Sequence, residues 1–366
     1  PISQAAWAQA RSEHGSHACA RLGSARRGAP MALVLDPFGP SRADFDRTIL
    51  AYFQQPPEGI VLRTEGLQTA ARRRLNGGVI LVWDEEHWRH KRGHVPKAPD
   101  HVDMHRPFDA SRFNFNKVDP REVIAKVRLQ DSLHPMLTNI SPLMVGHVIL
   151  ALHSESGLPQ GALGAEGVRC MAEFATMSAR RDFCVVYNSL GAFASVNHLH
   201  LHGMYLSGLD GDPKTDRMPL EVAERSFFAD FGGAKVSTLQ TDETKGLGMR
   251  AFAIEGLQAF AAEVAGHCVE VLHKLKIPHN LLVHAGRTEE EPMTFFVVPR
   301  QPQERFDVAA AGFNAAVCEV CGFLFMQSSE AYQAQSAVSV SRFFANGASL
   351  SPAAFGALMD HLADAL

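Results

Sequence analysis

The run Asn188-Ser-Leu-Gly-Ala-Phe-Ala-Ser-Val-Asn-His-Leu-His-Leu-His-Gly-Met-Tyr-Leu206 carries three histidines at alternate positions. Side chains of a β-strand point alternately to its two faces, so His198, His200 and His202 are predicted to share one face. The two leucines between them would share the other face. The pattern therefore predicts a strand with an apolar face against a core and an imidazole face along a surface or a cleft.

Three interpretations of these histidines compete. A metal site held by all three is strained, because Cα atoms four residues apart on a strand are about 13 Å apart, while zinc needs ligand nitrogens at about 2.0–2.1 Å. Three buried histidines satisfied by hydrogen bonds are the second interpretation. The third is nucleophilic catalysis, in which a neutral ring nitrogen attacks phosphorus while the other nitrogen keeps its proton on an acceptor. We favour the third, because flanking donors would stabilise charge on the phosphoryl oxygens.

The whole run from 188 to 206 resembles the GDP-hexose phosphorylases of the histidine-triad superfamily. The resemblance spans about residues 58–335. Other segments agree with it in the same order: Phe113-Asn-Phe-Asn-Lys117, Ser141-Pro-Leu-Met-Val-Gly-His-Val148, Pro278-His-Asn-Leu-Leu-Val283 and Phe313-Asn-Ala-Ala-Val-Cys-Glu319. The third motif position is commonly glutamine in the plant enzymes. Because it is His202 here, the sequence resembles the animal branch more.

The resemblance implies a role for most polar residues of the run. His200 would be the nucleophile on the nucleoside-side phosphorus, and the backbone carbonyl of His198 would hold the other ring N–H of His200. His202 and Ser195 would contact the phosphoryl oxygens. Asn188 stands where the family places a polar contact to the nucleotide.

Four further residues are expected near the substrate. Gly191 would let the chain bend close to the ligand, as glycine can. Arg300 and Arg305 follow a strand and offer planar donors to a phosphate, with surface arginine as the alternative. Lys117 ends a run in which phenylalanine and asparagine alternate. The polar face of that run would meet the nucleotide or else cap a loop.

The activity that the resemblance implies is phosphorolysis of GDP-glucose to GDP and glucose 1-phosphate through a guanylylated histidine. The partners are then a GDP-sugar and inorganic phosphate, and the scheme requires neither a metal nor a cofactor. Two alternatives stay open. One is another nucleotidyltransferase or hydrolase of the superfamily, such as a GDP-L-galactose or dinucleoside polyphosphate phosphorylase. The other is a non-catalytic nucleotide-binding protein. The preferred hexose and the oligomeric state also stay open.

The composition is typical of a globular chain without nucleic-acid or membrane partners. Hydrophobic residues make up 46% of the 366 residues, and the formal net charge is −4. No apolar run reaches the ~18 residues of a membrane-spanning helix. The six cysteines are scattered, and Cys318-Glu-Val-Cys321 is interpreted as core cysteine rather than as a redox or zinc site. We therefore expect a cytoplasmic protein.

We predict an α+β fold of two histidine-triad-like halves, antiparallel sheets with packed helices, that form an intramolecular pseudo-dimer. Residues 58–209 would be the catalytic half and 210–366 a half without the motif, divided at the loop 207–213. Residues 1–57 would be an N-terminal extension. Its first 30 residues hold four arginines and one acidic residue, which indicates a transit peptide or upstream sequence before a start at Met31.

The local patterns predict the order of elements within each half. Helices are expected over 44–53, 163–180, 257–275, 308–321 and 352–366, and a loop over 87–103. Strands are expected over 79–83, 123–129, 137–140, 147–152, 183–187, 198–206, 279–284 and 294–299.

Overall fold

The computed structural model of the chain describes residues 33–36, 42–64, 66–67, 69–86, 102–207, 215–239, 247–284 and 291–365. Three regions discussed above therefore lie outside the described residues in whole or in large part. They are the first 30 residues, the loop 87–103 and the loop 207–213.

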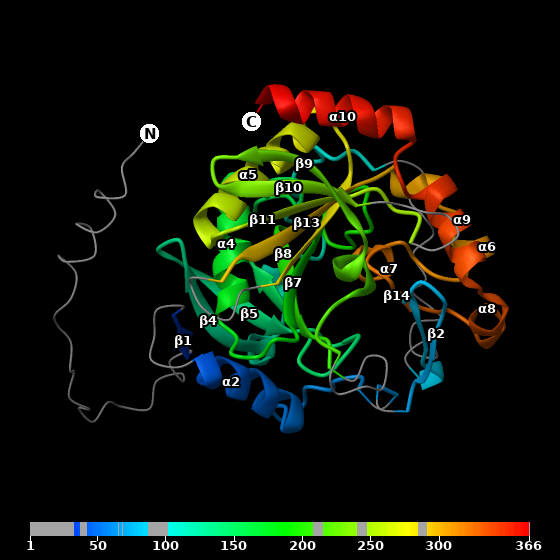
Figure 1. Cartoon of the computed structure of the whole chain (residues 1–366). Helices are drawn as coiled ribbons and strands as arrows, with labels where there is room; N and C mark the ends of the chain where they lie inside the picture. The colour runs from blue at the N-terminus through cyan, green and yellow to red at the C-terminus, as the bar shows by residue number, and fades with distance from the viewer. Residues whose placement is uncertain are drawn as a thin grey trace. The chain divides into compact units, whose positions relative to one another are not determined.

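One long sheet runs through the described part of the chain, with eleven strands in the order β1-β4-β5-β6-β8-β7-β12-β13-β11-β10-β9 (Figure 1). Its central strands are buried on both faces, which explains their near-continuous apolar sequences. The strands are β1 (Val34–Leu35), β4 (Val123–Leu129), β5 (Ser132–Thr138), β6 (Val148–Ala151), β7 (Phe183–Asn188), β8 (His200–Tyr205), β9 (Arg225–Phe231), β10 (Ala234–Leu239), β11 (Phe252–Gly256), β12 (His279–His284) and β13 (Met293–Pro299).

The sheet consists of two copies of one topology. In the first half the order is β4-β5-β6-β8-β7, with helix α4 (Gly164–Thr176) between β6 and β7 in the chain. In the second half the order is β9-β10-β11-β13-β12, with helix α5 (Gln258–Lys274) between β11 and β12. The copies join where β7 pairs antiparallel with β12, for example Val185 opposite Val283. The predicted pseudo-dimer of two α+β halves is confirmed. The exact domain boundaries stay a prediction.

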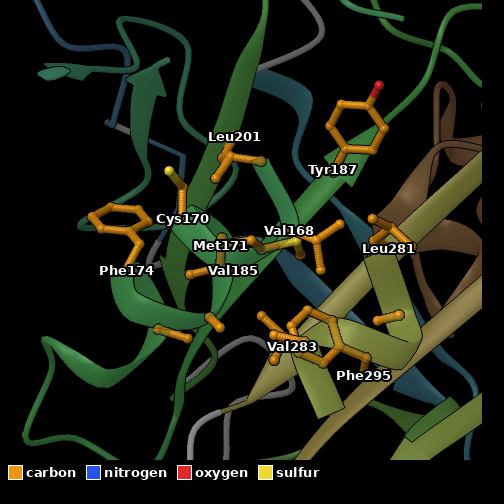
Figure 2. Packing of buried hydrophobic residues seen from close by; sticks show 14 of the residues in the cluster. Val168, Cys170, Met171, Phe174, Val185, Tyr187, Leu201, Leu281, Val283 and Phe295 are labelled. Carbon is orange, nitrogen blue, oxygen red and sulfur yellow. The ribbon is translucent and has the colours of Figure 1, made fainter. Parts of the chain in front are cut away.

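Helices α4 and α5 pack against each other and cover one face of the sheet (Figure 1). Val168, Met171 and Phe174 recur at helical spacing on the buried side of α4. In Figure 2 they meet Leu201 of β8, so the motif strand has its leucine face in this core, as predicted. Burial of one such leucine contributes about 1.5–3 kcal/mol of stability.

A second core lies on the opposite face of the sheet. There Val186, Met204 and Phe296 pack against a small sheet in the order β14-β3-β2. Cys318 and Cys321 are buried in this cluster, as expected for core cysteines. The small sheet is formed by β2 (Ala71–Arg74), β3 (Ile80–Trp83) and β14 (Phe323–Phe325).

The remaining helices differ in how well their sequences predicted them. α2 (Arg42–Gln54) and α10 (Pro352–Ala365) match their predictions. The predicted helix 308–321 is wrong, because it divides into single turns on either side of Gly312, whose φ of 71° ends the first turn. The shorter elements are α6 (Val308–Ala311), α7 (Val317–Val320), α8 (Ser329–Ala334), α9 (Ala337–Gly347) and the 3₁₀ turns η1 (Phe115–Lys117), η2 (Pro120–Glu122), η3 (Ser154–Ser156), η4 (Pro219–Val222) and η5 (Gln303–Arg305). None of the helices in the described ranges has both the length and the apolar character that a bilayer crossing needs.

Candidate active site

The motif strand β8 begins at His200 and lies between β6 and β7 in the first half. His202 stands opposite Val186 of β7, so their side chains share one face of the sheet. The prediction that all three histidines belong to the strand is wrong for His198, which lies in a bend before it. The reason is that the His198 ring bonds to two segments outside the sheet.

His200 is held as a neutral imidazole with one defined tautomer. Its Nδ1 lies 2.7 Å from the backbone oxygen of His198. A carbonyl can only accept, so the proton sits on Nδ1 and the lone pair on Nε2. Burial lowers the pKa of His200 to about 4, although the hydrogen bond to the His198 carbonyl opposes this shift. Nε2 has no hydrogen-bond partner among the described residues, and the geometry therefore presents an unprotonated nitrogen with a free lone pair.

Gln160 fastens the start of β8 to the end of β7. Its Oε1 accepts the backbone N–H of His200 at 2.9 Å. Its Nε2 donates to the carbonyls of His200 at 3.1 Å and of Asn188 at 2.8 Å. Gln160 is fully buried. One side chain thus fixes the position of His200 relative to Asn188 on the neighbouring strand.

The ring of His198 has a structural role that is separate from the role of its carbonyl. Its Nδ1 accepts the backbone N–H of Phe115 at 3.1 Å, and its Nε2 donates to the carbonyl of Ser154 at 3.2 Å. The ring also stacks on Phe115, whose own ring lies against His200. Burial lowers the pKa of His198. The ring therefore joins η1 and η3 to the loop that carries the nucleophile candidate.

A fourth histidine, His147, sets the tautomer of His202. The backbone N–H of Leu143 donates to Nδ1 of His147 at 3.1 Å, so the neutral ring of His147 keeps its proton on Nε2. That nitrogen lies 3.1 Å from Nδ1 of His202. His202 then keeps its own proton on Nε2, as a donor. Burial, His200 and His147 together hold the pKa of His202 well below its usual range.

Asn188 lies beside the nucleophile candidate with its amide anchored by the second half. Its Oδ1 accepts from Nδ2 of Asn280 at 2.7 Å and from the backbone N–H of Val317 at 2.9 Å. Only 8% of Asn188 is exposed. Its Nδ2 makes no hydrogen bond within the described part of the chain.

The loop between β7 and β8 packs against the second half at Gly191. This glycine has a φ of 76°, and a Cβ there would lie 3.0 Å from Cγ of Pro278. Its carbonyl accepts the N–H of Gln303 at 2.7 Å. Ser195, further along the loop, is exposed and has no hydrogen bond to another described residue. Its expected phosphoryl contact stays a prediction.

Arg300 is fully buried, which excludes the surface-arginine alternative for this residue, whereas Arg305 is exposed. Its Nη1 donates to the carbonyl of Ala315 and lies 3.5 Å from Oδ1 of Asn280. Its guanidinium lies over the ring of Phe193 in the loop between β7 and β8. Burial lowers the pKa of Arg300 to about 9. Nη2 is buried without a hydrogen-bond partner in the described ranges, and direct phosphate contact by Arg300 stays a prediction.

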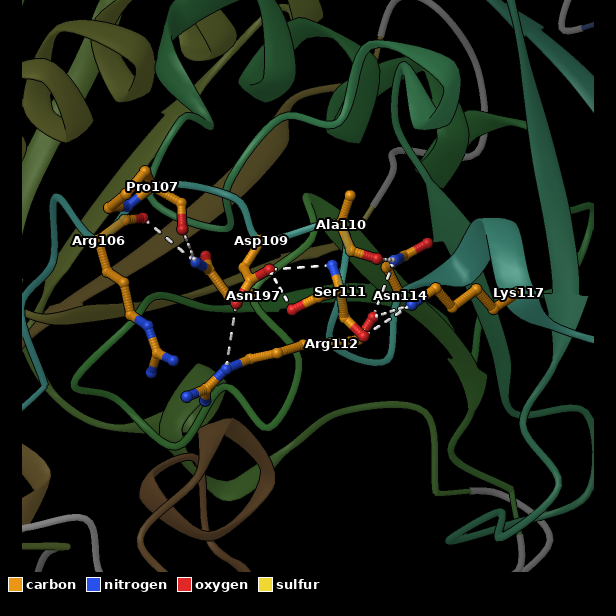
Figure 3. A network of polar contacts seen from close by, with 9 residues as sticks. All are labelled: Arg106, Pro107, Asp109, Ala110, Ser111, Arg112, Asn114, Lys117 and Asn197. Atoms are coloured by element: carbon orange, nitrogen blue, oxygen red, sulfur yellow. Dashed lines mark hydrogen bonds and ion pairs between the residues drawn. The ribbon is translucent and has the colours of Figure 1, made fainter.

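Lys117 is exposed at the edge of a polar network (Figure 3). Its Nζ donates to the carbonyls of Ser111 and Arg112 at 2.9 and 2.8 Å. In the same network, Asn197 donates to the carbonyls of Arg106 and Pro107. Asn197 belongs to the motif run, so the network attaches this outer loop to the site. The expected nucleotide contact of Lys117 stays a prediction.

Three residues of this site received no role from the sequence: Gln160, His147 and Asn280. His147 and Asn280 lie in segments that carry the family resemblance, so a signal was present for them. Gln160 had none, because its importance depends on how three distant segments meet. No group of three or more His, Cys, Asp or Glu side chains in the described ranges is arranged to hold a metal ion.

Two family descriptions match this chain. "GDPGP1-like, N-terminal domain" covers residues 44–204, and "GDPGP1-like, C-terminal domain" covers residues 221–366. Among solved structures, yeast Ap4A phosphorylase Apa2 in complex with Ap4A has a TM-score of 0.55 at 14% identity. The match covers 85% of this chain and 98% of that chain, and it supports the shared fold alone.

Curated relatives include enzymes from animals and a plant. GDP-D-glucose phosphorylase 1 of Macaca fascicularis is 30% identical over 325 residues, which are 83% of this chain and 78% of that protein. The protein of the same name from Bos taurus is 31% identical over 66% of this chain and 64% of its own length, so the match spans slightly less than two thirds of it. GDP-L-galactose phosphorylase 1 of Arabidopsis thaliana is 28% identical over 72% of this chain and 61% of that protein.

Proposed function

The chain belongs to the GDPGP1-like family, and from this we propose that it is a nucleotidyltransferase that cleaves GDP-glucose by phosphorolysis. The products are GDP and glucose 1-phosphate. The relatives named GDP-D-glucose phosphorylase 1 support the substrate. The observation in the site that carries the proposal is His200, whose proton is held on Nδ1 by the His198 carbonyl while Nε2 is unprotonated.

In the first step, Nε2 of His200 attacks the guanosine-side phosphorus. A nitrogen–phosphorus bond forms as the bond from that phosphorus to the bridging oxygen breaks, and glucose 1-phosphate leaves. The imidazole becomes cationic when it is guanylylated, and the His198 carbonyl at 2.7 Å stabilises that cation. In the second step, inorganic phosphate attacks the same phosphorus and releases GDP and neutral His200.

Phosphoryl transfer depends mainly on in-line positioning and on stabilising charge on the phosphoryl oxygens. Nε2–H of His202 and the amide nitrogen of Asn188 are donors without partners in the described residues, on the same face as His200. We assign both of them to the phosphoryl oxygens. The hydroxyl of Ser195, in the loop between the two strands, is a third candidate donor.

Phosphorolysis of GDP-glucose by the wild-type protein and by His200→Ala tests the proposal. We expect the variant to lose more than about 10³-fold in kcat/KM, because the nucleophile is gone. We also expect the wild-type protein alone to become guanylylated on incubation with GDP-glucose, as measured by mass spectrometry of the intact chain. Full activity of His200→Ala would overturn the mechanism, and release of GMP without GDP would show hydrolysis instead.

GDP-L-galactose is the second candidate substrate, because a plant relative of that name matches 72% of this chain. A panel of GDP-sugars assayed for phosphate-dependent GDP release separates the two. We expect GDP-glucose to have the higher kcat/KM, since the third motif residue is His202 rather than the glutamine of the plant pattern.

We also propose that the protein works in a reducing compartment, and the cytoplasm is the simplest one. Within the described residues, Cys170, Cys184, Cys268, Cys318 and Cys321 are free and buried. Free thiols are the usual state in the cytosol, where disulfides are rare. Cell fractionation with the full-length protein tests the location.

A further inference from the structure

The orientation of the Asn188 amide is fixed by groups that can act in only one way. The backbone N–H of Val317 only donates, so the atom it meets at 2.9 Å must be the Asn188 oxygen. The Asn280 amide donates to the same oxygen at 2.7 Å. Both acceptor positions of that oxygen are therefore occupied. The amide nitrogen must point the other way, where it has no partner among the described residues.

The direction of the Asn280 amide is fixed in the same manner. Its nitrogen also donates to the carbonyl of Ala192 at 3.1 Å, and a carbonyl can only accept. Its oxygen faces Nη1 of Arg300 at 3.5 Å, and a guanidinium can only donate. The hydrogen bonds therefore run in one direction, from Arg300 to Asn280 and from Asn280 to Asn188. All three side chains are buried, with exposed fractions of 0%, 0% and 8%.

This chain of hydrogen bonds ends next to the nucleophile candidate. Gln160 donates from one nitrogen to the carbonyls of both Asn188 and His200, so the two residues lie side by side. Val186 and His202 share a face of the sheet, and Asn188 and His200 are each two residues from them along their strands. The Asn188 side chain therefore lies on the nucleophile's face.

We propose that Asn280 is a positioning residue that aims the amide nitrogen of Asn188 at the phosphoryl oxygens of the substrate, with Arg300 holding Asn280. Asn280 lies on β12, and Arg300 directly follows β13. The half without the histidine motif therefore contributes to the site through these two residues. The inference rests on the proposed function for its substrate. The amide orientation itself stands on the hydrogen bonds alone.

Asn280→Asp separates positioning from packing. Aspartate keeps the shape of asparagine and would pair with Arg300, but its carboxylate cannot donate to the Asn188 oxygen. The Asn188 amide then loses its preferred direction. In its original orientation the Asn188 oxygen faces the new carboxylate, and in the flipped orientation the Asn188 nitrogen faces the Val317 N–H. We expect kcat/KM to fall about tenfold to a hundredfold, and further than in Asn280→Ala. A residue that only fills space would tolerate aspartate better than alanine.

A double-mutant cycle with Asn188→Ala completes the test. Without the amide there is nothing to orient, so the additional loss caused by Asn280→Asp should disappear in that background. Asn76→Asp, on the exposed turn between β2 and β3, is the charge-matched control and should match the wild-type protein. Where Asn280→Asp fails to fold in a thermal-unfolding assay, Asn280→Ala takes its place in the same cycle, with an expected loss of about three- to tenfold.

The affinity for GDP, measured by calorimetry, distinguishes failure of this inference from failure of the proposed function. A wild-type protein that does not phosphorolyse GDP-glucose contradicts the function, and the cycle is then carried out on GDP affinity alone. Wild-type values for Asn280→Asp would overturn the positioning role. An equal loss in the Asn188→Ala background would overturn it as well.

Discussion

At the scale of single residues, backbone groups decide which nitrogen of each histidine carries its proton. The His198 carbonyl acts on His200, and the Leu143 N–H acts through His147 on His202. Since a carbonyl only accepts and an N–H only donates, these tautomers follow without reference to the substrate. The site therefore holds one unprotonated nitrogen and one N–H donor side by side before any ligand binds.

His147→Leu should reduce kcat while leaving KM nearly unchanged. Without the His147 donor, His202 can place its proton on Nδ1 and present a lone pair to the phosphoryl oxygens, which weakens stabilisation in the transition state. We expect a loss of about tenfold to a hundredfold in kcat, measured with GDP-glucose as substrate. His147→Gln keeps an amide donor at the same reach and should recover most of the activity. ¹⁵N NMR of the histidine rings should show a mixture of His202 tautomers in the leucine variant only.

At the scale of elements, the sequence predicts the strands at the centre of the long sheet better than those toward its outer end in the second half. β7, β12 and β13 are largely apolar runs, and the sequence predicts them as strands. The sequence predicts neither β9 nor β10. β9 is the outermost strand of the sheet, is only partly buried and carries polar residues. β11 is a short strand that neighbouring strands bury, and its five residues show no alternating pattern that would predict it.

For the candidate site, the sequence assigns roles mainly to residues that belong to one run. The resemblance assigns roles to His200 and Asn188, which lie in one run of sequence on either side of the turn between β7 and β8. Asn280 and Gln160 could not be given roles, because their contacts depend on pairing between segments that are distant in the chain. That pairing is a property of the tertiary structure, and the periodicity of hydrophobic residues in the sequence does not predict it.

Gly191→Ala tests the turn between β7 and β8. A φ of 76° is strained for alanine, and its Cβ would meet Pro278 of the second half at 3.0 Å. We expect a loss of about 1–3 kcal/mol in unfolding free energy and a lower kcat/KM, because the loop positions Asn188 and Ser195.

Gly356→Ala is the matched control for that variant. Gly356 lies within α10, and a Cβ there meets nothing within 4 Å. Alanine should stabilise the helix by about 0.5–1 kcal/mol. Chemical denaturation of both variants measures the contrast. Equal effects of the two substitutions would contradict the role given to Gly191.

At the scale of the whole described structure, burial keeps several histidines neutral. It lowers the pKa values of His134, His200 and His279 to about 4. The unfolded chain binds protons at these rings near pH 6.5, whereas the folded chain does not. The stabilisation that these neutral rings contribute is therefore fully present above about pH 6.5, and it is lost as the pH falls toward 4.

Unfolding free energy should accordingly fall between pH 7 and pH 5, by up to about 2 kcal/mol for each of these rings. His279→Phe removes one ring from this balance, and its stability should depend less on pH than that of the wild-type protein. Urea denaturation at the two pH values measures the difference. An identical pH dependence in the variant and the wild-type protein would refute the assignment to His279.

The pairing of β7 with β12 has a consequence for any attempt to divide the protein. Both strands lie in the interior of the sheet and every residue of each is buried. A fragment containing only one half would display a long apolar margin of unpaired amide and carbonyl groups, the kind of edge that recruits other chains. Separately produced halves should therefore aggregate when alone. When expressed together they should reassemble, and activity should return only in the reassembled pair.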